Sequence, residues 1–218
     1  MIEARRFRDR VEAGRLLAGE LDRYVLRADV VVLGLPRGGV PVAYEVARAL
    51  RAPLDVMVVR KLGLPQQPEL AMGAIASGGV RVLNTDLLAY LHVSEDTIQS
   101  VAEREQRALE ARERAYRGMR PPTDLAGRTV VLVDDGLATG ASMRAAVSAA
   151  RQRGASRIVV AVPVAAPETI DEMRREVDEI VYVQAPSRFS AVGLWYEDFA
   201  ETSDDTVRDL LQRAADVS

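Results

Sequence analysis

Two adjacent carboxylates followed by a turn rich in glycine and hydroxyl groups are the strongest chemical signal in this sequence. Residues 130–133 are apolar, Asp134 and Asp135 come next, and a Gly-Leu-Ala-Thr-Gly-Ala-Ser turn follows. The apolar residues predict a buried strand, and open α/β sheets bind ligands at the carboxyl ends of such strands. Backbone N–H groups at the start of the next helix, with the hydroxyls of Thr139 and Ser142, can surround a phosphate. Because carboxylates suit ribose hydroxyls or a water-bound Mg²⁺, the stretch predicts a site for a sugar phosphate with a metal.

A second candidate anion site is the Gly-Leu-Pro-Arg-Gly-Gly loop at residues 34–39, which follows an earlier apolar run. Gly38 and Gly39 allow the backbone to approach an anion closely, and Arg37 can add positive charge. The N-terminus of the following helix adds its dipole. An ordinary turn is the alternative, because Gly-Gly before a helix is common.

Arg60 and Lys61 form a basic pair directly after the apolar run at residues 54–59. Lys61 is the single lysine of a chain with 29 basic residues, so every other one is arginine. We expect the pair to end a parallel strand and to face the same crevice as the carboxylates. Solubility alone would also explain an exposed basic pair. A compact ammonium differs from guanidinium as a phosphate ligand, which favours a functional lysine.

An aromatic cluster near the C-terminal end could form a hood over a planar substrate. It includes the single tryptophan, and its candidate residues are Phe189, Trp195, Tyr196 and Asp198. Aromatic rings can stack on a planar acceptor, and a nearby acid could bind the ring nitrogens of that acceptor. Packing against the core explains the same aromatics equally well. His92 lies on a short polar turn and is expected to be a surface residue, not a catalytic base.

The elements that must position these residues alternate between strands and helices. Continuous apolar runs predict about five strands buried on both faces, at residues 30–33, 54–59, 130–133, 158–162 and 180–183. Helix-like segments lie between them at residues 40–50, 141–153 and 167–176. This order predicts an α/β fold with a doubly wound, mainly parallel sheet. Further helices are expected at residues 9–26 and 203–215.

Two regions fall outside this alternation. Residues 62–83 contain prolines and a Ser-Gly-Gly turn, which predict a mobile loop containing a hairpin, as in lids and binding loops. Residues 94–117 predict an extra helix that is N-capped by Ser94 and packed by one apolar stripe, with a dimerisation helix as the alternative. We expect a single domain over residues 1–218, with its core at 28–183 and the hood at 184–202.

Composition excludes several classes of function. With no cysteine and one histidine, the chain has no disulfide, no thiolate nucleophile and no Cys- or His-rich metal site. A net charge of -3 argues against a nucleic-acid footprint. The apolar stretches are shorter than the roughly 20 residues that cross a bilayer, so we expect a cytoplasmic protein without membrane contact.

Residues 130–142 resemble the signature with which type I phosphoribosyltransferases bind 5-phosphoribosyl-1-pyrophosphate (PRPP). The resemblance implies that Asp134 and Asp135 hold the ribose diol and, through water, Mg²⁺. It places the 5'-phosphate on Leu137, Ala138, Thr139, Gly140, Ala141 and Ser142. It places the pyrophosphate on Arg37, Gly38, Gly39, Arg60 and Lys61. Asp134, Asp135 and Lys61 would be the catalytic residues, and a mobile loop beyond Lys61 would close over the reaction.

The activity implied by this resemblance is transfer of the phosphoribosyl group of PRPP to a nitrogen nucleophile, with release of pyrophosphate. Catalysis would rest on positioning and charge stabilisation, which agrees with the lack of a cysteine nucleophile. The partners would be PRPP and a small acceptor that the sequence does not identify, and a homodimer is compatible with the sequence. The alternatives are a non-catalytic PRPP or nucleotide sensor and a hydrolase of phosphorylated ribosyl compounds. A receiver domain fits less well, since its acid pair lies early and its lysine late.

Overall fold

A five-stranded parallel sheet forms the centre of the computed structural model, which describes residues 5–216. Its strand order is β2-β1-β6-β7-β8, and all four neighbouring pairs are parallel. The five strands are β1 (Val30–Gly34), β2 (Leu54–Val56), β6 (Thr129–Val133), β7 (Arg157–Val164) and β8 (Glu179–Gln184). The predicted parallel sheet is therefore confirmed, with each strand overlapping one of the predicted apolar runs.

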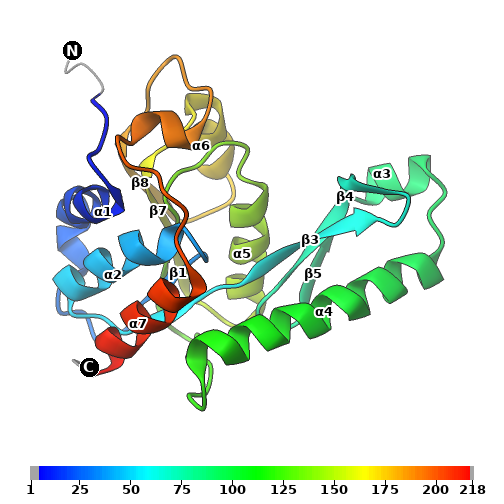
Figure 1. Cartoon of the computed structure of the whole chain (residues 1–218), viewed down its shortest axis with the longest axis horizontal. Coiled ribbons are helices and arrows are strands. Elements are labelled where there is room, and N and C mark those ends of the chain that lie inside the picture. Colours follow the sequence, from blue (N-terminus) through cyan, green and yellow to red (C-terminus); the bar gives the residue numbers. More distant parts are fainter. Residues whose placement is uncertain (1–4, 217–218) are drawn as a thin grey trace.

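Helices cover both faces of this sheet (Figure 1). Val30 and Val32 pack with apolar side chains of α1 (Arg10–Gly19), α2 (Gly39–Leu50) and α7 (Asp204–Ala215). The intervening residues Val31 and Leu33 point to the other face, because side chains alternate along a strand. There they pack with α5 (Ala141–Gln152) and α6 (Pro167–Met173). The helix expected at residues 9–26 is shorter than predicted, and a 3-10 turn, η1 (Asp22–Tyr24), follows it.

Residues 59–117 form an arm that projects to one side of this body (Figure 1). The arm contains a separate antiparallel sheet, followed by two helices. Its elements are β3 (Val59–Leu64), β4 (Gln67–Ala76), β5 (Val80–Leu83), α3 (Thr85–Tyr90) and α4 (Glu95–Arg117). The predicted hairpin is confirmed, since β4 and β5 pair across the turn at residues 77–79, whereas the expectation of a loop around it is corrected, because most of residues 62–83 are paired in strands.

The apolar run at residues 54–59 is divided between the two sheets, which corrects the prediction of one strand. The backbone of β2 pairs with β1 only as far as Val56. The N–H of Val58 then donates to Oγ of Ser77 at 2.8 Å, and the N–H of Ser77 donates to the carbonyl of Val58 at 2.9 Å. The chain has changed partner by this point, so the residues that follow belong to the arm.

Helix α4 has the predicted apolar stripe, and the side chain of Ser94 caps it by accepting a hydrogen bond from the N–H of Thr97. The buried stripe contains Ile98, Val101, Ala102, Leu109 and Tyr116. At its C-terminal end, Nε of Arg117 lies 2.7 Å from Oδ1 of Asp55 in β2, and both side chains are less than one-tenth exposed. This buried ion pair ties the arm to the central sheet.

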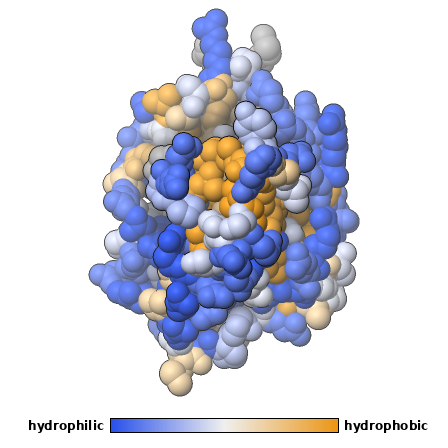
Figure 2. All heavy atoms as spheres, turned by 90° about the vertical axis from the view of Figure 1, so that its right-hand side faces the viewer, coloured by the Kyte–Doolittle hydropathy of each residue, from blue (hydrophilic) through white to orange (hydrophobic). Residues whose placement is uncertain are grey.

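The free end of the arm presents an apolar surface. The view onto that side of the molecule shows hydrophobic residues gathered at the centre of a mostly hydrophilic face (Figure 2). Leu70, Tyr90 and Leu91 of the arm are among the large hydrophobic side chains that remain exposed. Across residues 5–216 no helix has the length and apolar character that spanning a membrane requires.

Candidate active site

The two predicted acids lie where β6 ends, at the carboxyl edge of the parallel sheet. Oδ1 of Asp134 accepts a hydrogen bond from the N–H of Asp135 at 2.8 Å. Oδ2 of Asp135 accepts a hydrogen bond from Nε of Arg10 at 2.9 Å. The hydroxyl of Tyr196 donates to the backbone carbonyl of Asp135 at 2.6 Å. Asp135 is thus held from two sides, by α1 and by the predicted hood.

Burial disfavours the charged form of both acids. It raises the pKa of the Asp134 carboxyl well above its usual range, and the neighbouring charge of Asp135 raises it further. Burial also raises the pKa of Asp135, although the Arg10 guanidinium opposes this shift. A cation bound beside the pair would favour the ionised carboxylates, because an opposite charge stabilises them.

The donor set at this position suits Mg²⁺. Oδ1 of Asp135 accepts no hydrogen bond from any other residue in the range 5–216, so it is available to a ligand. Mg²⁺ is commonly held by one or two carboxylates, with water and substrate phosphate supplying the other oxygens. Over the same range, no group of three or more His, Cys, Asp or Glu side chains could hold a metal. Asp134 and Asp135 would therefore share the ion with substrate and water.

The loop of residues 35–39 packs directly against the two acids. The N–H of Leu35 donates to the carbonyl of Val133 at 2.9 Å. A Cβ at Gly39 would lie 2.7 Å from that same carbonyl oxygen, and a Cβ at Gly38 would lie 2.0 Å from Oδ2 of Asp135. Both distances are shorter than real contacts allow, so a side chain at Gly39 would collide with the backbone, and one at Gly38 would have to displace the Asp135 carboxylate. The structure thus brings the two predicted anion-binding segments into contact.

The turn before α5 presents a row of unused backbone donors. Gly140 has a φ of +75° and caps the helix, which begins at Ala141. None of the N–H groups of residues 138–142 donates to another described residue. Ala138, Thr139, Ala141 and Ser142 are exposed at this point. These features form the geometry of an anion-binding helix N-terminus.

Leu137 anchors this turn to the sheet. Its side chain is buried, its N–H donates to the carbonyl of Val164 at 2.9 Å, and its carbonyl accepts from the N–H of Ala166. Its N–H is therefore used by the fold, and the donors left for an anion are those of residues 138–142. Arg144 of α5 also holds the turn, because its Nη1 donates to the carbonyl of Thr139 at 2.8 Å.

The predicted cations do not all gather around the acids. Arg37 forms an ion pair with Glu201. Arg60 lies 2.7 Å from the carboxylate of Glu105 on α4. Arg60 and Lys61 were expected at the end of a parallel strand, but both lie on β3 of the arm, because the chain changes partner before Val59. Their binding of pyrophosphate stays a prediction.

Arg10 is a cation that contacts Asp135 and was not predicted from the sequence. Arg10 begins α1, far from residues 130–142 in sequence, and no motif surrounds it. Its guanidinium lies 4.0 Å from the centre of the Phe199 ring, and Nη1 donates to the carbonyl of Ala200 at 2.7 Å. The one available signal was its position at the start of an amphipathic helix.

The aromatic hood is built together with the N-terminal segment. The N–H of Phe7 donates to the carbonyl of Trp195 at 2.8 Å, and the N–H of Glu197 donates to the carbonyl of Phe7 at 2.8 Å. The ring of Tyr196 is buried between Phe7 and Phe199, with centroid distances of 5.4 and 5.1 Å. Tyr196 therefore packs and orients its hydroxyl, and a ring so enclosed does not stack on a substrate.

The other hood candidates are spread around this cluster. Phe189 and Trp195 are half-buried and pack against it, whereas Asp198 is exposed and accepts a hydrogen bond from the N–H of Ala200 at 2.9 Å. His92 is exposed, as predicted, with its Nδ1 2.8 Å from the carbonyl of Ala89.

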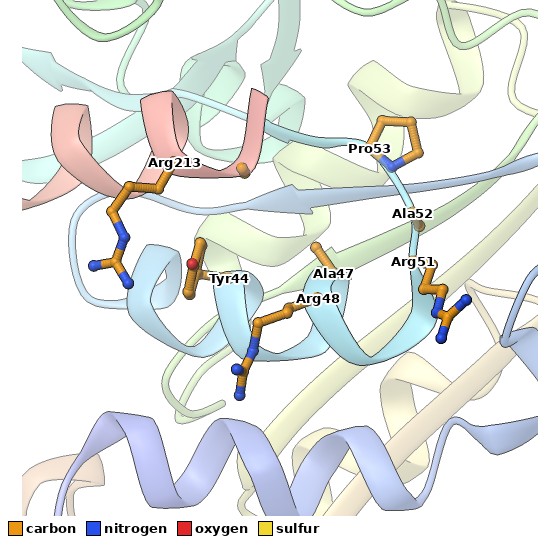
Figure 3. A pocket seen from close by; sticks show the side chains of 8 residues that line it. Tyr44, Ala47, Arg48, Arg51, Ala52, Pro53 and Arg213 are labelled. Atoms are coloured by element: carbon orange, nitrogen blue, oxygen red, sulfur yellow. The ribbon is translucent and has the colours of Figure 1, made fainter. Parts of the chain in front are cut away.

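A cavity of about 580 Å³ lies apart from these residues, between α2 and α7 (Figure 3). Tyr44, Arg48, Arg51 and Arg213 are among its lining residues, and no predicted site residue lines it. Arg48 already pairs with Glu45 at 2.8 Å, and Arg213 pairs with Asp209 at 3.4 Å. The carboxyl edge of the sheet therefore remains the candidate active site.

Known proteins resemble the chain over nearly its whole length. The family model for the phosphoribosyl transferase domain matches residues 8–196. This chain belongs to that family. The phosphoribosyl transferase domain is also 48% identical to the protein TT1426 from Thermus thermophilus, whose crystal structure superposes with a TM-score of 0.82. That match covers 95% of this chain and 98% of the other.

Two curated proteins are also similar to this chain, over different shares of their own length. A Mycobacterium tuberculosis protein, Rv0571c, is named among the phosphoribosyl transferases and is 49% identical over 208 residues, which are 95% of this chain and 47% of that protein. The phosphoribosyl transferase domain thus spans about half the length of this curated relative. A uracil phosphoribosyltransferase of Streptomyces griseus is 32% identical over 145 residues, covering 62% of this chain and 63% of the enzyme.

Proposed function

We propose that this domain binds PRPP together with Mg²⁺ and transfers its phosphoribosyl group to a nitrogen nucleophile, with release of pyrophosphate. The observation that carries the proposal is the close approach of Gly38 and Gly39 to the two acids. A ligand that bridges the two segments must present a diol or metal to the acids and an anion to the loop. A second anion must reach the N–H groups of residues 138–142, at the start of α5.

PRPP has these three groups in the required order. Its 5'-phosphate would accept hydrogen bonds from residues 138–142, and its ribose hydroxyls would donate to Asp134 and Asp135. Its pyrophosphate would lie along Arg37, Gly38 and Gly39. When bound, Mg²⁺ would neutralise part of the charge on the pyrophosphate oxygens.

In the reaction, the bond from C1' to the pyrophosphate oxygen breaks, and a bond from C1' to the acceptor nitrogen forms. The electron pair of the broken bond leaves with pyrophosphate, and the proton of the acceptor nitrogen passes to solvent. The protein residues hold the two reactants in line and stabilise the developing charges, so no covalent intermediate with the protein is needed.

Calorimetric titration with PRPP and Mg²⁺ tests the binding step. The double variant Asp134→Asn/Asp135→Asn should lose affinity severely, since the diol and the metal-bound water lose their charged acceptors. The matched control is Asp209→Asn, which alters an exposed acid of α7. Equal PRPP affinity in the double variant and the wild type would remove the assignment of the acids.

Pyrophosphate release with a panel of nucleobases tests the transfer step. Uracil is the first acceptor to try, because a uracil phosphoribosyltransferase is among the relatives. Release that depends on a base would establish transfer. Release of pyrophosphate from PRPP without a base, or of base from a nucleoside 5'-monophosphate, would indicate a hydrolase. PRPP binding without turnover on any base would favour a sensor.

A further inference from the structure

Arg10 makes three contacts that together leave its side chain little freedom. Its Nε donates to Oδ2 of Asp135 at 2.9 Å, and its Nη1 donates to the carbonyl of Ala200 at 2.7 Å. The guanidinium lies over the ring of Phe199, 4.0 Å from the centroid. The side chains of Arg10 and Asp135 are 12% and 15% exposed, so the pair is shielded from most of the solvent.

The contact with Asp135 uses one carboxylate oxygen and leaves the other open. Oδ2 receives the hydrogen bond from Arg10, whereas Oδ1 receives none from any other residue between 5 and 216. An ionised carboxylate can accept several hydrogen bonds through its two oxygens. The Arg10 contact therefore fixes the rotation of the Asp135 side chain and directs Oδ1 toward whatever ligand enters.

The backbone of Asp135 is held as well, by the hood. The hydroxyl of Tyr196 donates to its carbonyl at 2.6 Å. Phe7 pairs with the strand-like residues next to Tyr196, which brings the start of α1 to the hood. The segment that carries Arg10 and the segment that carries Tyr196 thus form one unit.

We propose that Arg10 is a positioning residue for the phosphoribosyl site, holding the Asp135 carboxylate in the rotation that accepts a ribose hydroxyl. The inference rests on the proposed function and assigns a role to a helix outside the signature. Two of the cations predicted from sequence are engaged elsewhere, because Arg37 pairs with Glu201 and Arg60 pairs with Glu105. A Cβ at Gly38 would come within 3.3 Å of Nε of Arg10, so the guanidinium also borders the predicted pyrophosphate loop.

The test compares Arg10→Met with Arg15→Met by calorimetry. Methionine keeps an apolar stem of similar length against Phe199 and removes the donors. Arg15 lies on the same helix, pairs with Glu45 at 3.1 Å and is 59% exposed, so it is the matched control. The ligands are PRPP with Mg²⁺, and ribose 5-phosphate and 2-deoxyribose 5-phosphate without metal. The last two differ in one hydroxyl, which isolates the contact with the acids.

We expect Arg10→Met to weaken ribose 5-phosphate and PRPP about tenfold, the effect of losing one well-directed hydrogen bond to a charged group. The wild type should prefer ribose 5-phosphate to its 2-deoxy analogue, and Arg10→Met should lose most of that preference. Affinity for the 2-deoxy analogue should stay the same, because the 5'-phosphate cradle is untouched. Arg10→Lys should recover part of the preference, since it restores a charged donor without the planar fork.

The possible results separate this inference from the proposed function. An unchanged hydroxyl preference in Arg10→Met, or an equal loss for both sugar phosphates, would overturn the positioning role. If the wild type bound the sugar phosphates but not PRPP, the proposed function would fall, and the hydroxyl preference would still decide the role of Arg10. If the wild type bound none of the three ligands, both proposals would fall. Thermal unfolding of each variant identifies any loss of folding.

Discussion

The surroundings of Asp134 oppose the ionisation of its carboxyl group, so the stability of the fold depends on pH. Its folded-state pKa lies above its usual value, so the folded protein binds the proton more tightly than the unfolded chain does. The contribution of Asp134 to the unfolding free energy is therefore greatest below the unfolded pKa. It falls as pH rises through the unfolded pKa toward the folded pKa.

We accordingly predict that Asp134→Asn stabilises the ligand-free domain near neutral pH while it weakens PRPP binding. A neutral amide avoids the burial of a charge, and a gain of about 1 kcal/mol is typical when a functional residue is replaced in this way. Thermal unfolding at about pH 7 and about pH 3 measures the gain, which should shrink at the lower pH because Asp134 is then largely protonated in both states. A gain that is equal at both pH values would contradict this account.

Lys61 lies on β3 of the arm and not on a strand of the parallel sheet, so its contact with pyrophosphate would depend on how the arm lies over the bound ligand. If this contact forms, it should strengthen as the leaving group gains charge. We predict that Lys61→Ala lowers turnover by roughly tenfold or more and leaves nucleoside 5'-monophosphate binding nearly unchanged. Lys61→Arg should recover part of the rate.

Steady-state kinetics and monophosphate titration measure these two effects separately. Arg81→Ala is the matched control, because Arg81 is an exposed cation on β5 of the same arm and donates to Gln99. A wild-type rate in Lys61→Ala would make Lys61 an ordinary surface cation.

At the scale of elements, the buried pair of Arg117 and Asp55 joins the arm to the sheet. Arg117 also donates to the carbonyl of Val56 at 2.8 Å and lies 3.0 Å from Glu113, while Asp55 accepts from the N–H of Thr123. Removing one member of such a network leaves a buried charge without its partner. This lowers the free energy of unfolding by more than the intact pair contributes to it.

We predict that Arg117→Met lowers the free energy of unfolding by about 3 kcal/mol. Arg114→Met should change it by less than about 0.5 kcal/mol, because exposed ion pairs contribute little. Arg114 is the suitable control, since it lies on the same helix, is 70% exposed and is 3.9 Å from Glu110. Denaturant titration measures both values, and equal effects of the two substitutions would exclude a special role for the buried pair.

The strands and helices of the body could be predicted from sequence because each is specified by its own residues. Apolar β-branched runs such as residues 130–133 are typical of strands buried on both faces. The division of residues 54–59 could not be predicted, because the run stays apolar where the chain changes partner. The new partner begins at Ser77, which is 19 positions away in sequence and hydrogen-bonded to Val58.

The candidate site was likewise predictable from sequence only in part. The acids with the turn that follows them, and the glycine loop, are each continuous in sequence and were predicted, and the structure brings the glycine loop into contact with the acids. Arg10 could not be predicted, because its contact with Asp135 spans 125 positions of the chain and depends on how α1 meets the hood. A long-range contact between two single polar side chains leaves no periodic pattern in the sequence from which it could be predicted.

At the scale of the whole molecule, the body and the arm differ in how deeply they are buried. Every residue of β1 and β6 is buried, whereas β3 has one buried residue in six. Local opening is easier where few apolar contacts must be broken. We predict that amide hydrogens of β3–β5 exchange with solvent faster than those of β1, β6 and β7.

Hydrogen exchange followed by mass spectrometry measures this order. Adding PRPP with Mg²⁺ should slow exchange in the arm if the arm closes on the ligand, and slow it only at residues 34–39 and 134–142 if the arm stays open. Equal protection of body and arm in the free protein would contradict the predicted order.

The pairing of Phe7 with the residues beside Tyr196 also affects how the domain is made on the ribosome. The glycine loop, the acids and the phosphate turn emerge well before residues 194–200, which pair with the N-terminal segment. The nascent chain can thus assemble its parallel sheet while Arg10 still lacks Ala200 and Phe199. A chain that ends before residue 194 would therefore lack the support of Tyr196 for Asp135, and it would also lack α7, which packs against one face of the sheet.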